Sequence, residues 1–162
     1  MGTGHFQLQH QSSGMPCPLT LGIADRLLIQ WLQAVQNCAA CLVSCKPRYA
    51  CATPILRELH WLPVENRIIF KILLLVYKSL NNLAPAYINS FLKNYKPSRN
   101  LRSLDQCLLT VPRSNQRNYG DRAFSVAAPK LWNALPLDIR NSGSITLFKC
   151  KLKTFLFKKY YL

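Results

Sequence analysis

The chain has 162 residues, 49% of them hydrophobic, and its 21 Lys and Arg residues against 6 Asp and Glu residues give a formal net charge of +15. This length favours one domain, and this apolar content argues against a globally disordered chain. Seventeen of the basic residues lie within 64–162, together with only four acidic ones. A surface of this kind attracts RNA, DNA or an anionic membrane face, unless it is simply a soluble basic surface or one that sits on an acidic domain.

Residues 1–24 contain no Lys, Arg, Asp or Glu and show no helical or strand period. We interpret them as a flexible leader that precedes one basic domain at 25–162. They lack the basic and apolar regions of a signal peptide, and seven cysteines are an odd number for a disulfide framework. Both observations favour free thiols in an intracellular compartment, nuclear or cytoplasmic. No apolar run reaches the roughly 20 residues that a membrane span requires.

The first predicted helix follows Asp25, which suits an N-cap, and apolar residues then recur at helical spacing for about five turns. Cys38, Cys41 and Cys45 share one side of this helix, and Cys51 follows it. Clustered thiolates are typical of zinc sites, whereas free cysteines also suit the edge of a buried face. Because there is no second C-x-x-C motif to pair with Cys38 and Cys41, and no nearby histidine, we predict no metal. The leader holds three further scattered residues of this chemistry: His5, His10 and Cys17.

Thr53 and Pro54 predict an N-cap followed by a first-turn proline, and therefore a short helix over residues 54–59. His60 follows this helix and has the chemistry of a general base. The sequence places no nucleophile or carboxylate partner beside it, so a structural role in the turn is the alternative. Nothing in this stretch predicts a cofactor.

The stretch Leu59–Asn82 predicts a central helix. Pro63 suits a first helical turn, and Ile68–Tyr77 is apolar apart from one lysine. A helix that is apolar nearly all round belongs in the middle of a core, so we expect the other helices to pack around it. Its basic positions form one narrow stripe, which consists of Arg67, Lys71 and Lys78.

Two basic loops flank one short extended segment. A helix of about three turns is predicted over residues 85–95, and 107–111 is short and stops before Pro112, which is typical of a strand or an extended segment. Arginines among aromatic and amide side chains suit RNA, because arginine binds phosphate and tyrosine stacks on unpaired bases. A solvated loop is the alternative. The residues in question are Arg99, Arg102, Arg113, Arg117, Tyr119 and Arg122.

Two more helices are predicted after these loops. Asp121 suits the cap of the first, in which Pro129 predicts a kink or a division into two. Ser144 suits the cap of the last helix, where Lys149 and Lys153 are among the lysines beside an apolar stripe. Such a helix lies on a membrane or on nucleic acid, or is a surface helix of a basic domain. The stripe consists of Ile145, Phe148, Leu152, Phe155 and Leu156.

These elements predict a mainly α fold: an irregular bundle of five to six helices around a central apolar helix, with a short extended segment or hairpin. Several long segments carry a family resemblance, among them T-P-I-L-R-E-L-H-W-L-P-V-E-N-R-I-I-F-K-I-L-L-L-V-Y-K-S-L-N-N-L-A-P-A-Y-I, Y-G-D-R-A-F-S-V-A-A-P-K-L-W-N-A-L-P and F-K-C-K-L-K-T-F-L-F. In order and spacing, residues 25–162 resemble the C-terminal region of reverse transcriptases from LINE-type (non-LTR) retrotransposons. The chain departs from the family at Cys41, commonly an arginine, and at Asn82, usually a glycine.

The resemblance implies a segment downstream of the polymerase fingers, palm and thumb that helps to hold template RNA or target DNA. The chain has no Y/F-A-D-D motif and no endonuclease carboxylate set, so we expect no enzyme activity. We expect a non-catalytic accessory region that binds RNA or DNA with little sequence preference. The alternative is a remnant that docks on a polymerase body, which predicts an exposed apolar patch. The expected binding residues are Arg99, Arg102, Arg113, Arg117, Tyr119, Arg122, Lys149 and Lys153.

Overall fold

The computed structural model describes residues 23–47, 49–96, 107–113, 120 and 123–162. Within these ranges the fold is mainly α, with seven helices and no sheet, as the sequence predicted. Two of the seven helices are single turns of four residues each. One of those two, α6 (Leu137–Arg140), has no counterpart among the predicted helices.

Helices α1 (Ile23–Val43) and α2 (Ala52–Glu58) pack on each other through a small core. Both begin before their predicted caps. Asp25 is the third residue of α1, so its assignment as N-cap was wrong, and the N-cap of α2 is Cys51 rather than Thr53. Pro54 still lies in the first turn of α2, where its missing N–H breaks no helical bond. The small core consists of Ala40, Cys41, Ile55 and Leu56.

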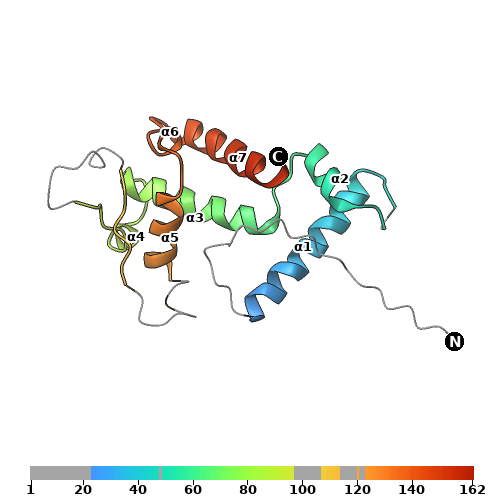
Figure 1. Cartoon of the computed structure of the whole chain (residues 1–162), viewed down its shortest axis with the longest axis horizontal. Helices are drawn as coiled ribbons and strands as arrows, with labels where there is room; N and C mark the ends of the chain where they lie inside the picture. Colours follow the sequence, from blue (N-terminus) through green and yellow to red (C-terminus); the bar gives the residue numbers. More distant parts are fainter. Residues whose placement is uncertain (1–22, 48, 97–106, 114–119, 121–122) are drawn as a thin grey trace.

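Helix α3 (Val64–Leu80) occupies the centre of the fold, as predicted, and begins directly after Pro63. It contacts α1, α4 (Ala86–Asn89), α5 (Phe124–Asn133) and α7 (Ile145–Tyr161). Figure 1 shows α7 running alongside α3, with α1 and α2 at one end of it and α4 and α5 at the other. Burial is incomplete, however, because Ile68 and Leu75 each keep 38% of their surface exposed.

The larger core lies where α3, α5 and α7 meet. The Tyr77 ring stacks on Phe148 with 4.3 Å between centroids, and its hydroxyl donates a 2.7 Å hydrogen bond to the Ser142 carbonyl. Ser144 caps α7 as predicted, because its Oγ accepts a hydrogen bond from the Leu147 N–H at 3.2 Å. The predicted apolar stripe of α7 faces this core: Phe148, Leu152 and Leu156 are buried, and Ile145 and Phe155 pack against them.

The predicted three-turn helix over residues 85–95 was wrong in its second half. After α4 the chain extends and pairs with the predicted extended segment through an antiparallel bridge between Asn94 and Leu109. The Asn133 amide of α5 donates to the Leu109 carbonyl at 2.8 Å and accepts from the Leu109 N–H at 2.9 Å. A side chain of a helix that is distant in the sequence therefore holds the extended segment in place. Local sequence pattern does not predict such contacts.

Helix α5 runs from Phe124 to Asn133 without interruption at Pro129, so it is not divided into two. Pro129 is the sixth residue of α5. Because proline has no backbone N–H, α5 lacks one hydrogen bond to a carbonyl of the preceding turn. Burial among the α3 and α7 contacts compensates for that lost bond, because Ala128, Leu131 and Trp132 all belong to the larger core. The predicted cap, Asp121, lies outside the described residues.

Three helices end in the same motif, with a non-glycine residue in the left-handed conformation. Cys45, His60 and Asn82 have φ values of 50°, 54° and 55° after α1, α2 and α3. In each case the following N–H bonds back across the last turn, as in a Schellman motif. These bonds join Lys46 to Cys41 at 3.0 Å, Trp61 to Leu56 at 2.9 Å and Leu83 to Lys78 at 2.7 Å. Asn82 therefore adopts the conformation that glycine usually supplies.

Candidate nucleic-acid interface

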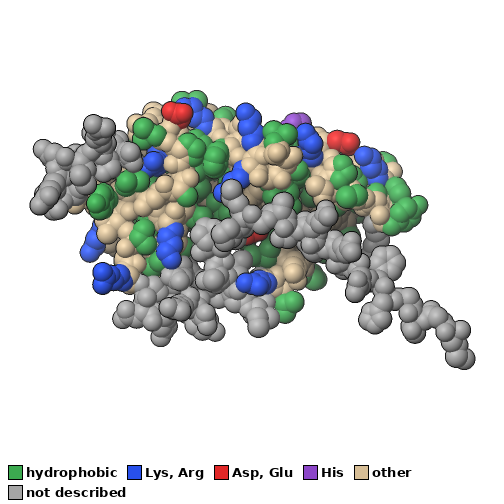
Figure 2. Space-filling view, in the orientation of Figure 1, with side chains coloured by type: hydrophobic (Ala, Val, Ile, Leu, Met, Phe, Trp, Pro, Cys, Tyr) green, Lys and Arg blue, Asp and Glu red, His purple; other side chains and the backbone are tan. Residues whose placement is uncertain are grey.

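Three of the eight predicted binding residues fall within the described part of the chain. Lys149 and Lys153 lie one turn apart on α7, and Arg113 follows the extended segment; all three are exposed. The other five lie outside the described residues: Arg99, Arg102, Arg117, Tyr119 and Arg122. Figure 2 shows basic side chains spread over one face of the molecule, interleaved with apolar ones.

Lys153 lines a hollow of about 500 Å³ between α3 and α7, which we call the basic cleft. Arg67 and Lys71 of α3 line the same hollow, so three cations from two helices converge there. The sequence predicted both the basic stripe of α3 and the lysines of α7, but it did not predict that they line the same hollow. The remaining lining residues are Gln36, His60, Trp61, Leu62 and Phe70.

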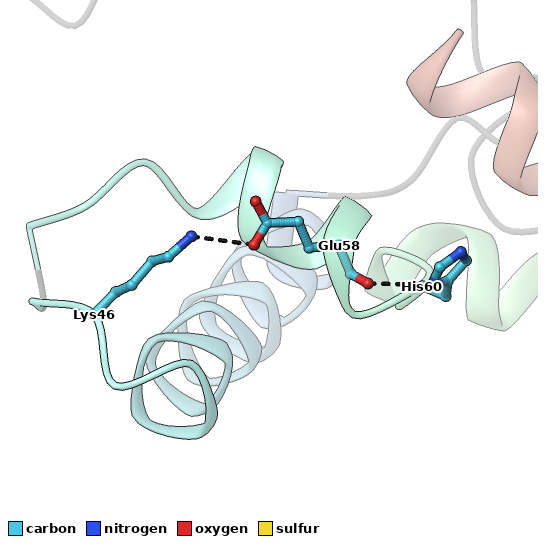
Figure 3. Close-up of polar contacts among 3 residues, drawn as sticks. All are labelled: Lys46, Glu58 and His60. Atoms are coloured by element: carbon cyan, nitrogen blue, oxygen red, sulfur yellow. Dashed lines mark hydrogen bonds and ion pairs between the residues drawn. The ribbon is translucent and has the colours of Figure 1, made fainter.

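The turn after α2 builds one wall of the basic cleft. His60 stacks on Phe157 of α7 at 5.6 Å between ring centroids, and its Nδ1 lies 3.1 Å from the Glu58 carbonyl oxygen. A carbonyl only accepts, so this contact favours the tautomer with a proton on Nδ1. The Glu58 carboxylate pairs instead with Lys46 at 3.1 Å (Figure 3). His60 therefore has the surroundings of a structural residue rather than those of a general base.

Tyr161 ties the end of α7 to the same turn. Its hydroxyl donates a 2.8 Å hydrogen bond to the Trp61 carbonyl. Burial, with a smaller contribution from Tyr160, raises the pKa of Tyr161 to about 12. The phenol therefore remains protonated, and able to donate, at all ordinary pH values. This contact fixes α7, and with it Lys153, relative to the α2–α3 turn.

A second hollow, of about 590 Å³, lies between α1 and α3, and we call it the apolar groove. Gln36, Trp61, Arg67 and Lys71 line both hollows, so the groove adjoins the basic cleft. Its other lining residues are apolar: Leu32, Val35, Ala39, Val64, Ile68, Ile72 and Leu75. The sequence did not indicate this groove, because a helix that is apolar nearly all round predicts neighbours on every side of α3.

The cysteines of α1 divide between the core and the surface. Cys41 is buried in the small core, whereas Cys38 and Cys45 are exposed. Within the described ranges, no three His, Cys, Asp or Glu side chains gather closely enough to hold a metal ion. The thiol of Cys41 instead has the role of a small apolar core residue.

No helix in the described part of the chain has both the length and the apolar character that crossing a membrane demands. Comparison of the chain with protein-family models, with curated proteins and with solved structures gave no match. The class that the structure itself defines is a mainly α-helical domain with a basic cleft beside an apolar groove. The resemblance to reverse transcriptases rests on the sequence segments alone.

Proposed function

We propose that the chain is a non-catalytic nucleic-acid-binding region derived from a LINE-type reverse transcriptase, acting inside the cell in the nucleus or cytoplasm. The observation that supports this proposal is the convergence of Arg67, Lys71 and Lys153 in the basic cleft. Several cations that line one hollow neutralise several phosphates of a nucleic-acid backbone, and each such contact adds to the affinity.

The proposed binding uses charge together with aromatic surface. The cleft cations neutralise backbone phosphates and release the counterions condensed on the nucleic acid. The rings of Trp61 and His60 in the cleft lining are the candidates for stacking on unpaired bases. Lys149 extends the cationic surface by one turn of α7. Charge and ring faces discriminate weakly between bases, so the region binds RNA or DNA with little sequence preference.

The test compares two triple variants of equal charge. Arg67→Ala/Lys71→Ala/Lys153→Ala removes the three cleft cations, and Arg57→Ala/Lys93→Ala/Lys96→Ala removes three exposed cations that do not line the cleft. Binding to a single-stranded RNA and to duplex DNA is measured over a salt series. The cleft variant lowers the slope of log K against log salt by about 2 for the RNA and nearly 3 for the duplex. Equal losses in the two variants would refute a specific role for the cleft.

A protein-docking remnant is the second candidate, and an exposed apolar surface on α1 favours it. Trp31 is 65% exposed and Leu28 57% exposed, on the helix that also forms one wall of the apolar groove. Large apolar side chains gathered on one surface are typical of protein–protein interfaces. In this proposal a polymerase body covers α1, and the isolated chain has no activity of its own.

A further inference from the structure

The apolar groove remains open although its walls are hydrophobic. Val35 is 49% exposed, and Leu32, Ile68 and Leu75 are each 38% exposed. These side chains come from two helices that contact each other, so they form one continuous surface. A continuous exposed apolar surface in a folded domain is typical of a binding site.

The walls of the groove follow helical register. Leu32, Val35 and Ala39 are spaced i, i+3, i+7 along α1, and Ile68, Ile72 and Leu75 are spaced i, i+4, i+7 along α3. Each row covers about two turns, or roughly 10 Å of helix. Two adjacent helices with such rows offer gaps that receive the side chains of a third helix. The shape therefore favours a helix with an apolar stripe as the occupant.

Charge indicates what kind of helix fits. Arg67 and Lys71 lie one turn apart on α3, both are exposed, and both line the groove, and none of the lining residues that the structure describes is acidic. A partner with acidic residues four positions apart matches this edge. A second copy of this chain does not, because its own formal net charge of +15 opposes association.

Gln36 joins the base of the groove to the turn before α3. This side chain is only 8% exposed and lines the groove. Its Nε2 donates to the Leu62 carbonyl at 2.9 Å, which fixes the orientation of the amide, and its Oε1 has no hydrogen-bond partner in the described part of the chain. That oxygen is itself shielded from solvent, so an occupant of the groove does not reach it, and the role of Gln36 is to hold α1 against the turn before α3.

We propose that the apolar groove binds an amphipathic helix of a partner protein, with acidic residues on the flank that faces α3. This proposal goes beyond nucleic-acid binding, although Arg67 and Lys71 line both hollows and serve both proposals. Val35 and Leu75 line the groove alone, whereas Lys153 lines the basic cleft alone.

The probe is a fluorescein-labelled helical peptide with leucines at i, i+3/i+4 and i+7 and glutamates on one flank. Fluorescence polarisation measures its binding to the full chain, beside a peptide with lysines in place of the glutamates. Val35→Glu/Leu75→Glu places acidic groups in the groove. Leu137→Glu/Leu147→Glu is the matched control, because those leucines are 42% and 46% exposed and lie outside the groove.

We expect the groove variant to weaken binding of the acidic peptide at least tenfold and the control variant to change it less than twofold. The lysine peptide binds at least tenfold more weakly than the acidic one, and Lys153→Ala leaves acidic-peptide binding unchanged while it weakens RNA binding. Thermal unfolding of each variant establishes that it is folded. Absence of acidic-peptide binding, or equal binding of both peptides, would overturn the proposal. Dimerisation that the groove variant abolishes would also overturn it, in favour of a second copy as occupant.

Discussion

Asn82 shows how single residues limit the stability of this chain. It lies in the left-handed conformation at φ 55°. Residues other than glycine are strained there, and asparagine is among the least strained of them. Because the backbone bonds of the motif need no side chain at this position, glycine can replace it without losing them. The same reasoning applies more strongly to Cys45, since cysteine has no special tolerance of this conformation.

We therefore predict that Cys45→Gly raises the free energy of unfolding by about 1 kcal/mol and Asn82→Gly by somewhat less. Urea denaturation followed by circular dichroism measures both. The matched control is Ala134→Gly at the end of α5, where the backbone is right-handed at φ −78°. That substitution lowers stability by roughly 0.5–1 kcal/mol. A loss of stability in Cys45→Gly would contradict the account of strain.

At the scale of elements, one side chain joins α5 to the extended segment. The Asn133 amide both donates to and accepts from Leu109, whose own side chain is only 2% exposed. Trp132 adds a 2.9 Å hydrogen bond from its Nε1 to the Cys107 carbonyl. Consecutive residues of one helix thus satisfy the backbone of a segment that has no sheet to join.

Asn133→Asp removes the donor and sets a carboxylate against the Leu109 carbonyl, so we predict a loss of about 1–3 kcal/mol in the free energy of unfolding. Asn37→Asp is the control. The Asn37 Oδ1 only accepts, from the Gln33 Nε2 at 2.9 Å, and a carboxylate still accepts there. Chemical denaturation compares the two variants at pH 7. Equal effects would show that the Asn133 amide does not hold the segment.

These elements also mark what local sequence pattern predicts and what it misses. Pro63 and Ser144 lie where the chain enters α3 and α7, and the apolar stripe of α7 lies where its spacing required. The second half of the helix predicted over residues 85–95 is absent because the backbone of Lys93 and Tyr95 bonds to the extended segment at Thr110 and Leu108. Asn133 holds that segment in place through Leu109. Of the three cations of the basic cleft, only Lys153 was a predicted binding residue, and Arg67 and Lys71 were predicted only as a basic stripe of the central helix. That all three line one hollow depends on how α3 and α7 pack.

At the scale of the whole molecule, α7 joins the two cores. Phe148, Leu152 and Leu156 belong to the larger core, while Tyr161 packs against the small core of α1 and α2. The hydroxyl of Tyr161 donates to Trp61 only while it is protonated, and its pKa in the folded chain, about 12, lies above the ordinary tyrosine value of 10.0. A raised folded-state pKa contributes stability that is complete below pH 10 and is lost as the pH rises through 12.

We predict that Tyr161→Phe costs about 1 kcal/mol at pH 7, as expected for one hydrogen bond, and that this difference from the wild type disappears between pH 10 and 12. Unfolding in urea at a series of pH values measures the difference. Tyr160→Phe is the control: Tyr160 is 53% exposed, so loss of its hydroxyl changes stability little. A constant difference across the series would show that deprotonation of Tyr161 does not weaken the joint.

The contact between Tyr161 and Trp61 joins residues 100 positions apart, which matters for a chain made from one end to the other. At roughly 5–20 residues per second, a ribosome takes about 5 to 20 seconds to add the intervening residues. Within that interval α1 and α2 emerge from the ribosome before the helix that covers their core has been made. The apolar side chains of α1 are then accessible to chaperones and to other nascent chains.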